Sequence, residues 1–453
     1  MNGLLTLTLA FILSVGTSTA FQVPRLARSE RTLRHPHRLS AVATDEAAPR
    51  DYNSFVEWAM NYGIAAENLQ LNEQEKPGEW GGFAIQAASA GSRVLYVPAM
   101  LRLTSRRIRT EEFAALEPTI AQYFDATNTN GQINLACQFY IFLKVLQEFD
   151  KGEQSPYYAW LNALPRKFTT AITFDSFEVD CLPPFVGFLA KRDRANFDLF
   201  VEVLNSVDTP SISAATKADY EACKWAFNVV FTRARAAFEE AEIIPMADML
   251  NHRADPNVEV QYDDEGNVHV ILLRDVQPNE PLYKSYGQVT NPSRFLATYG
   301  FFDVSSQATY CKLMSGKTLT PELVNLGFVY DRMVFYHETG AIADEVWDVM
   351  LYTILGNIDK GQQQQFYNAH MQGDYATKQN MHAHYRLQAS QGLLQHVDEM
   401  LIELSNCASK IQQENHGGHE NLAMIQYHND FVRETFLKVR TNLEQMAAQS
   451  GGQ

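Results

Sequence analysis

The sequence predicts an α+β protein in which short β-strands flank a helical insertion and a helical region follows. Three observations support this fold class. Short apolar runs between turn signals indicate strands in residues 51–110 and again in residues 243–283. Apolar residues at three- and four-residue spacing fill the stretch between them, which indicates helices there. Amphipathic stretches continue towards the end of the chain, so an all-α region is expected after residue 303.

The first β-rich region begins with a short helix, predicted at residues 55–61. Strands are expected at residues 82–85 and 94–97, with Ala90-Gly91-Ser92 as the turn between them. Residues 111–242 are then mostly helical in pattern. The strands return as a hairpin, residues 257–262 and 268–273, around the turn sequence Asp263-Asp264-Glu265-Gly266-Asn267. The last region has long amphipathic stretches at residues 342–355, 385–412 and 423–447.

Length and composition restrict the function classes. The chain has 453 residues, 46% hydrophobic and 20% charged, which is ordinary globular composition and enough for two or three packed units. Its 37 Lys and Arg against 53 Asp and Glu give a formal charge of -16. A protein that neutralises nucleic-acid phosphates needs a basic face, so no nucleic-acid partner is expected. Five widely spaced cysteines without a CxxC pair indicate neither a disulfide framework nor a zinc site.

The amino terminus has the composition of a targeting segment. Residues 1–20 contain an apolar stretch too short to span a bilayer and end in Ser18-Thr19-Ala20, which is typical of a secretory signal peptide. Residues 21–49 begin with Phe21 and are rich in Arg, like a transit peptide. The combination resembles the bipartite presequence of algae whose plastids are reached through the endoplasmic reticulum. It predicts a protein of the plastid stroma with no membrane association in the mature form. The alternative is a secreted protein with a disordered basic pro-segment.

Candidate chemistry concentrates after residue 243. In Pro245-Met246-Ala247-Asp248-Met249-Leu250-Asn251-His252, Asp248 and His252 are four residues apart and would share one face of a helix. Three generic interpretations remain open for this segment alone. A metal site needs three or four ligands, and no further Cys or His lies at a workable spacing. A hydrolytic site needs a nucleophile, and neither a GxSxG elbow nor a Cys beside the His is present. The third is a capped helix with a buried polar pair.

Further motifs follow in a fixed order. Tyr286-Gly287 and Tyr299-Gly300-Phe301-Phe302 come after the Asp248 to His252 segment, and Glu79-Trp80-Gly81-Gly82 precedes it. Together they resemble the SET methyltransferase domain, specifically the subgroup of Rubisco large-subunit methyltransferase. The resemblance implies a SET domain in residues 50–303 with its helical insertion at about 105–242, and a helical substrate-binding domain in residues 304–450. Trp80 departs from the family, which has a glycine at this position of a Glu-Gly-x-Gly turn.

The resemblance also implies an activity. The chain would be an S-adenosyl-L-methionine-dependent protein-lysine N-methyltransferase that needs no metal. Its catalytic residues would be Tyr286 and Tyr299, and its cofactor-binding residues would be Glu79, Gly81, Arg235, Asp248, Asn251, His252, Tyr286 and Phe301. Among these, His252 is expected to contribute to the adenine pocket through its main chain.

The resemblance suggests substrates as well. Rubisco large subunit and fructose-bisphosphate aldolase are candidate plastid proteins, held by the helical insertion and the carboxy-terminal helical domain of a monomeric enzyme. Two alternatives remain open. One is a histidine N-methyltransferase of the same fold, and the other is a non-catalytic protein-binding module in which Trp80 blocks the cofactor.

Overall fold

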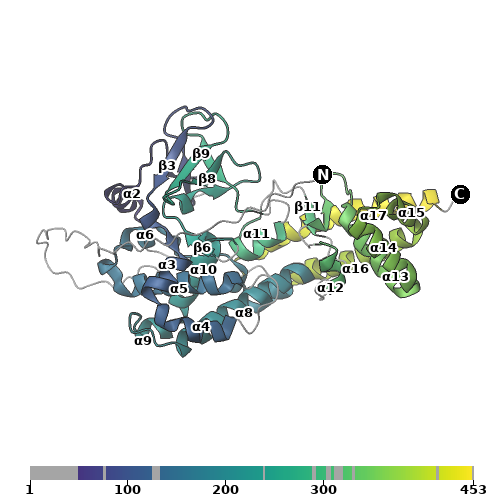
Figure 1. Cartoon of the computed structure of the whole chain (residues 1–453), viewed down its shortest axis with the longest axis horizontal. Helices are drawn as coiled ribbons and strands as arrows, with labels where there is room; N and C mark the ends of the chain where they lie inside the picture. The colour runs from purple at the N-terminus through teal and green to yellow at the C-terminus, as the bar shows by residue number, and fades with distance from the viewer. Residues whose placement is uncertain are drawn as a thin grey trace, which may run out of the picture. The chain divides into compact units, whose positions relative to one another are not determined.

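The computed structural model describes residues 49–74, 78–124, 133–237, 240–287, 292–302, 308–310, 320–328, 332–414 and 418–450 (Figure 1). All of them belong to the unit Arg38–Gln453. The predicted signal peptide lies outside the described residues, and so does the predicted transit segment except for residue 49.

Short strands form small sheets whose neighbouring strands are distant in sequence. One sheet has the order β1 (Gln70–Glu73), β2 (Trp80–Phe83), β10 (Pro281–Lys284), β7 (Asn251–His252). A second has the order β3 (Arg93–Val97), β9 (Val268–Leu272), β8 (Val258–Tyr262), and its strands lie side by side in Figure 1. A third has the order β4 (Leu103–Thr104), β6 (Glu240–Ile243), β5 (Arg235–Ala237). The first sheet therefore brings β2, β7 and β10 together.

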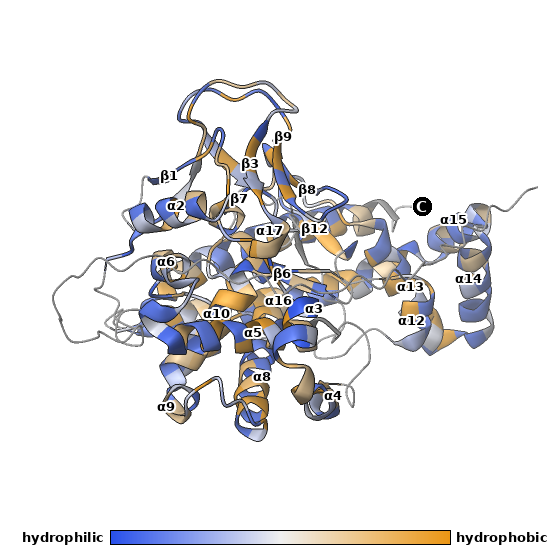
Figure 2. Ribbon diagram, turned by 60° about the vertical axis from the view of Figure 1, so that its left-hand side comes forward, coloured by the Kyte–Doolittle hydropathy of each residue, from blue (hydrophilic) through white to orange (hydrophobic). Residues whose placement is uncertain are grey.

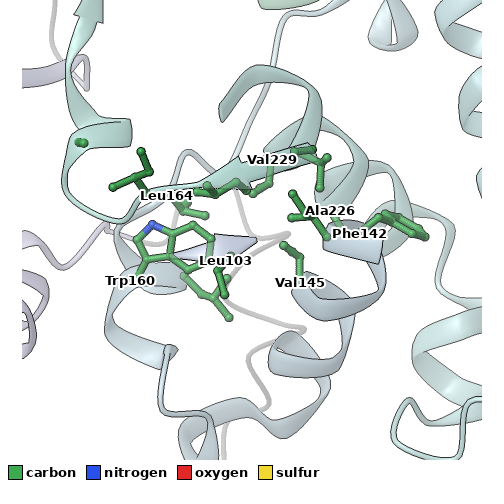
Figure 3. Close-up of a cluster of buried hydrophobic side chains, with 14 of the residues drawn as sticks. Leu103, Phe142, Val145, Trp160, Leu164, Ala226 and Val229 are labelled. Carbon is green, nitrogen blue, oxygen red and sulfur yellow. The ribbon is translucent and has the colours of Figure 1, made fainter. Parts of the chain in front are cut away.

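Helices fill the chain between β4 and β5. They are α3 (Ser105–Arg107), α4 (Glu117–Phe124), α5 (Ile133–Lys151), α6 (Tyr158–Ala163), α7 (Ser176–Asp180), α8 (Pro184–Ser206), α9 (Ala214–Ala218) and α10 (Tyr220–Arg233). Figure 2 shows hydrophobic residues concentrated in α5, α8 and α10. Figure 3 shows one buried cluster built from β4, α5, α6 and α10, with Leu103, Phe142, Val145, Trp160, Leu164, Ala226 and Val229 labelled. The insertion thus shares its core with the sheets and is fixed to them.

The carboxy-terminal region is mainly helical. It contains α11 (Pro292–Tyr299), α12 (Pro321–Asn325), α13 (Asp344–Ile358), α14 (Lys360–Gln372), α15 (Tyr375–His384), α16 (Arg386–Gln413) and α17 (Leu422–Ser450). The long helices α16 and α17 pack against each other, and the buried residues of α16 recur at helical spacing: Ala389, Leu393, Val397, Leu404, Cys407 and Ile411. In the described part of the chain, no helix is both long and apolar enough to cross a membrane.

The predicted α+β class is confirmed, with local differences. A helix precedes the first strands as expected, at α2 (Tyr52–Asn61). The predicted hairpin is present as β8 and β9. The predicted insertion range of about 105–242 also takes in β5 and most of β6. The predicted all-helical region contains a short antiparallel ladder of β11 (Ala308–Tyr310) and β12 (Val334–Tyr336).

Candidate functional site

A cavity of about 760 Å³ lies where the sheets meet the helical insertion. Its walls come from segments that are distant in the sequence: the start of α2, β2, the segment 165–169 after α6, the end of α10, the segment 248–252, and the segment 283–301. The predicted site residues Glu79, Asp248, Asn251, His252, Tyr286, Tyr299 and Phe301 all line it. Sequence motifs separated by about two hundred residues therefore meet around one hollow.

The parallel pairing of β7 with β10 assembles the centre of this site. Asn251 is opposite Tyr283 and His252 is opposite Lys284 in the register. The Tyr286 backbone N–H then donates to His252 Nδ1 at 3.0 Å. The two halves of the motif are thus joined by backbone pairing and by a histidine side chain.

Aromatic rings surround one end of the cavity. The Tyr286 ring lies 5.0 Å from the Tyr299 ring, centroid to centroid. The His252 ring stacks on Phe295 at 4.4 Å, and Phe295 in turn stacks on Phe301 at 5.4 Å. Such walls suit an aliphatic stem that carries a polar head, because the methylene groups can be buried against the rings. The His252 side chain, as well as its main chain, therefore belongs to the site.

The Tyr286 hydroxyl is held in place as a hydrogen-bond donor. It donates to the Leu250 carbonyl oxygen at 3.0 Å. Burial raises its pKa well above the ordinary value, and burial also raises the pKa of Tyr299. Both hydroxyls are therefore protonated at neutral pH, so neither is a phenolate base.

Asn251 joins β7 to β2 at the cavity wall. Its Nδ2 donates to the Trp80 carbonyl oxygen at 3.0 Å. The neighbouring Gly81 leaves room for this amide, since a Cβ at that position would lie 2.7 Å from Asn251 Nδ2. A larger residue at position 81 would therefore displace the Asn251 amide from its present position. Trp80 lies in a regular antiparallel strand opposite Glu73, and among the described non-glycine residues positive φ occurs at Met246 and Asn279.

A buried ion pair between Arg233 and Asp248 supports the part of the cavity wall that lies at the end of α10. Helix α10 begins at its Asp219 cap and ends at Arg233, followed by extended backbone. Arg233 Nη1 donates to Asp248 Oδ2 at 2.9 Å, and Trp160 Nε1 donates to the same oxygen at 3.1 Å. The insertion therefore reaches the site through α6 and α10. Figure 3 shows Trp160 within the buried cluster that fixes α6.

A second group of cationic and aromatic residues lines the cavity near β2. The Trp80 and Tyr52 rings stack at 3.7 Å between centroids, and the Arg50 guanidinium lies 4.9 Å from the Tyr52 centroid. Arg50 donates to the carbonyl oxygens of Ala163 and Gly78. Burial, together with repulsion from nearby Arg233 and Arg166, lowers the pKa of Arg50 to about 10. This part of the cavity is therefore suited to an anionic group.

Several buried polar atoms of the cavity residues have no hydrogen-bond partner within the described structure. They are Tyr52 Oη, Arg233 Nε and Asp248 Oδ1. Leaving a buried polar atom without a partner costs about 1–3 kcal/mol, so such atoms call for a ligand or ordered water. Their grouping at one cavity indicates a site for a polar ligand.

Three sequence predictions differ from the structure. Gly81 is buried in β2 and does not line the cavity, although its neighbours Glu79 and Trp80 do. Arg235 does not line the cavity, because it lies in β5, where its guanidinium donates to the Tyr262 hydroxyl at 3.1 Å. Arg233, two residues earlier, lines the cavity instead. The Asp248 to His252 segment is not a helix. It forms a 3₁₀ turn, Ala247–Met249, followed by β7, so the shared helical face does not exist.

Sequence reasoning missed Arg233, Arg50, Tyr52 and the segment 165–169. The last of these contacts the site closely, because Thr169 Oγ1 donates to the Gly300 carbonyl oxygen at 2.9 Å. The order of the motifs did not point to these residues, because they lie outside the motifs. Arg233 could be seen in the sequence as a basic residue near the end of a helix. Whether its side chain points into the cavity depends on the residue at which α10 ends.

The described residues contain no group of three or more His, Cys, Asp or Glu side chains that could hold a metal ion. Within the same residues, the cysteines Cys137, Cys181, Cys223 and Cys407 are free thiols. Of these, Cys137 is half-buried and the others are buried.

Comparison with known sequences identifies a family for part of the chain, which includes the sheets and the helical insertion. Residues 79–287 match the SET domain family. Two curated relatives are both called SET domain-containing protein 4. The one from Artemia parthenogenetica is 24% identical over 226 residues, which is 47% of this chain and 52% of the relative. The one from Mus musculus is 23% identical over 299 residues, which is 62% of this chain and 65% of the relative. The matches thus span between half and two thirds of these relatives.

Solved structures of similar fold cover more of the chain. The SET domain of LSMT bound to lysine and AdoHcy has a TM-score of 0.59 and 13% identity, covering 86% of this chain and 91% of that one. Rubisco LSMT bound to sinefungin and monomethyllysine gives 0.60 and 13%, with the same coverage. Rubisco LSMT bound to AdoMet gives 0.60 and 12%, covering 87% and 92%. At these identities the likeness establishes a common fold.

Proposed function

Because this chain is a SET-domain protein, we propose that it is an S-adenosyl-L-methionine-dependent protein-lysine N-methyltransferase of a plastid. The observation that carries the proposal is the cavity itself, which has the Tyr286 and Tyr299 rings at one end and Asn251 and Glu79 in its wall. The end of the cavity between Tyr286 and Tyr299 is called the acceptor channel below. An aromatic channel that leads to a polar pocket suits a lysine stem that approaches a bound methyl donor.

The residues present fit such a donor. S-adenosylmethionine supplies a methyl group on a positively charged sulfur, and it also carries a carboxylate and an adenine ring. Asn251, Glu79 and the backbone at Gly81 would hold the nucleoside and methionine parts. Arg233 would hold the carboxylate. It takes the cofactor-binding role first expected of Arg235, because Arg233 lines the cavity and Arg235 does not. The buried, unpartnered Arg233 Nε supports this assignment.

The protein's own task is to align the amine and to exclude water from it. Tyr286 remains protonated, and its hydroxyl is fixed by the Leu250 carbonyl oxygen, so the phenolic oxygen has a defined position in the channel. From there it orients the incoming amine and stabilises charge in the transition state, where preorganised dipoles are most effective. Tyr299 forms the facing wall and keeps the lysine stem dry.

The amine must lose its proton before it attacks. Free lysine has a pKa near 10.4, and burial in an aromatic channel disfavours its charged form. The rate of transfer should therefore rise as the pH increases above 8. A histidine acceptor, with an ordinary pKa near 6.5, would give a flat profile from pH 7 to 9. The pH profile thus separates the proposed lysine acceptor from histidine.

Transfer of radiolabelled methyl groups into a plastid extract, followed by peptide mass mapping, tests the activity and identifies the acceptor. Tyr286→Phe keeps the ring but removes the hydroxyl, so turnover should fall roughly a hundredfold with little change in donor affinity. Tyr262→Phe is the matched control, because Tyr262 does not line the cavity. Equal turnover in wild type and Tyr286→Phe would remove the hydroxyl from the mechanism, and a methylated histidine would replace lysine as acceptor.

Calorimetric titration with S-adenosylmethionine addresses the alternative of a non-catalytic module. Trp80 lines the cavity and stacks on Tyr52, so the indole has a packed position against the wall. We expect the donor to bind beside it. Absence of binding to wild type, with binding restored in Trp80→Gly, would favour the module.

The proposal extends to partner and location. Rubisco large subunit and fructose-bisphosphate aldolase are the candidate substrates, held by the insertion and the carboxy-terminal helices of a monomer. A fluorescent protein fused behind residues 1–50 should reach the plastid in a secondary-plastid alga. Phe21→Ala should leave it in the secretory route, and secretion of the unmutated fusion would contradict the proposed location.

A further inference from the structure

Helix α11 carries Tyr299, which lines the cavity, and Phe295, which packs against the cavity residue His252. Phe295 stacks on the His252 ring, and Tyr299 faces Tyr286. The chain continues directly into Phe301, which also lines the cavity. The position of this short helix therefore sets the spacing between the channel walls.

A buried hydrogen bond ties the start of α11 to α17. Ser293 Oγ lies 2.9 Å from His428 Nε2. Ser293 is 4% exposed and His428 is fully buried. Just beyond the other end of α11, the Phe302 ring packs edge-on against Tyr427 at 5.0 Å and Phe431 at 5.1 Å, both in α17. Helix α17 thus holds both ends of the segment that forms the channel wall.

The donor and the acceptor can be assigned for each hydrogen bond between Ser293, His428 and Asn429. Burial lowers the pKa of His428 to about 4, so the ring is neutral at pH 7 and has one donor and one acceptor. Asn429 Nδ2 donates to the Cys181 carbonyl oxygen at 2.9 Å, which turns Asn429 Oδ1 towards His428 Nδ1 at 3.2 Å. His428 Nδ1–H is therefore the donor to Asn429, and His428 Nε2 accepts the Ser293 hydroxyl proton.

We infer that His428 is a positioning residue for the acceptor channel, acting through Ser293 to fix α11 and hence the separation of Tyr299 from Tyr286. The inference rests on the proposed function and extends it, because it makes the carboxy-terminal helices part of the catalytic unit. Loss of the His428 to Ser293 bond should disturb acceptor turnover and the number of methyl groups added. Donor binding should remain, since Asn251 and Arg233 are held by other elements.

Two isosteric substitutions separate this role from simple packing. His428→Gln places an amide oxygen near the position of Nε2 and keeps an acceptor for Ser293. His428→Asn places its amide near Nδ1, so it keeps the contact with Asn429 and leaves Ser293 without an acceptor. His428→Asn and Ser293→Ala should lower kcat about ten- to a hundredfold and shift the ratio of methylated products, whereas His428→Gln should stay within about threefold of wild type. Donor Kd should be unchanged in all three.

Lys410→Met is the matched control. Lys410 also bonds the carboxy-terminal helices to the insertion, through the Asp180 carbonyl oxygen at 2.8 Å, but it does not touch α11. Its turnover and product ratio should match wild type. Amide hydrogen exchange of residues 293–302, followed by mass spectrometry without any ligand, should quicken in His428→Asn and Ser293→Ala but not in His428→Gln or Lys410→Met.

The outcomes are distinct. Wild-type turnover and product ratio in Ser293→Ala and His428→Asn would overturn the inference, and so would equal losses in the Gln and Asn variants. If wild type transfers no methyl group, the proposed function fails, and the exchange experiment alone then decides whether His428 fixes α11. Unchanged exchange in Ser293→Ala, a variant that removes one oxygen atom, would overturn that positioning role as well.

Discussion

Lys284 is a half-buried lysine beside Tyr286, the tyrosine proposed to be catalytic, and replacing it with methionine should stabilise the protein at neutral pH. Its Nζ donates to the Ala247 carbonyl oxygen at 2.9 Å and lies 5.5 Å from the centre of the Tyr286 ring. Burial lowers the pKa of Lys284 to about 8, although Asp248 acts in the opposite direction. The unfolded chain retains an ordinary lysine pKa near 10.4.

The size of the effect follows from this difference. Between pH 8 and 10.4 the unfolded state binds a proton that the folded state does not, so wild-type stability should rise with pH by about 3 kcal/mol from this group. Below pH 8 both states are protonated, and the folded state bears the full cost of burying the charge. Lys284→Met removes that cost, but it leaves the Ala247 carbonyl oxygen without its donor, at about 1 kcal/mol. The variant should be more stable than wild type by about 2 kcal/mol at pH 7.

Urea unfolding at pH 7, 8, 9 and 10 measures the difference between the two proteins. It should fall from about 2 kcal/mol in favour of Lys284→Met at pH 7 to about zero near pH 10, where the folded wild type has lost its charge. Lys410→Met is the control, because Lys410 makes the same kind of bond to a carbonyl oxygen on the surface. A difference that does not change with pH would refute the argument that charge burial at Lys284 destabilises the fold.

Two further substitutions test the cavity walls. Asn251→Ala should weaken S-adenosylmethionine binding about ten- to hundredfold in calorimetry, corresponding to about 1–3 kcal/mol for a lost buried hydrogen bond; unchanged affinity in a folded variant would remove Asn251 from the donor site. Asp248→Ala leaves the Arg233 guanidinium buried without a countercharge and should lower the free energy of unfolding by about 3–5 kcal/mol. Asp248→Asn keeps an acceptor oxygen but also removes the countercharge, so the ion-pair argument predicts that it loses most of the same free energy in the urea titration; a variant Asp248→Asn as stable as wild type would contradict that argument.

The fold class could be predicted because its signals are local. The β8 to β9 hairpin was visible as two apolar runs around a turn, and the structure shows Asp263 accepting from the Asn267 backbone N–H at 2.8 Å across that turn. The amphipathic pattern of α16 was visible in the same way. The pairing of β2 with β10 and of β10 with β7 was not, because hydrophobic patterns do not say which distant strands will meet.

The candidate site was predictable only as far as its motif extends. Tyr286, Tyr299 and Asn251 were singled out because they occur together in a recognisable order, and they line one cavity. The choice between Arg233 and Arg235 depended on the residue at which α10 ends. Since the helix ends at Arg233 and a strand follows, residues two apart belong to different elements and reach different surroundings. No composition or spacing rule gives that boundary to the nearest residue.

The joining of distant strands at the cavity has a consequence for the synthesis of the chain. The Asn251 to Trp80 bond links positions 171 residues apart, and the Tyr286 to Leu250 bond closes a further loop of 36. Closing long loops carries an entropic cost before the contacts repay it, so such pairings form late in folding. The helices of the insertion can form during translation. The cavity cannot form completely until Phe301, which lines it, has left the ribosomal exit tunnel. A nascent chain that stalls before that point would expose His252 and Tyr286 without Phe295 and Tyr299, the rings that pack against them in the folded protein.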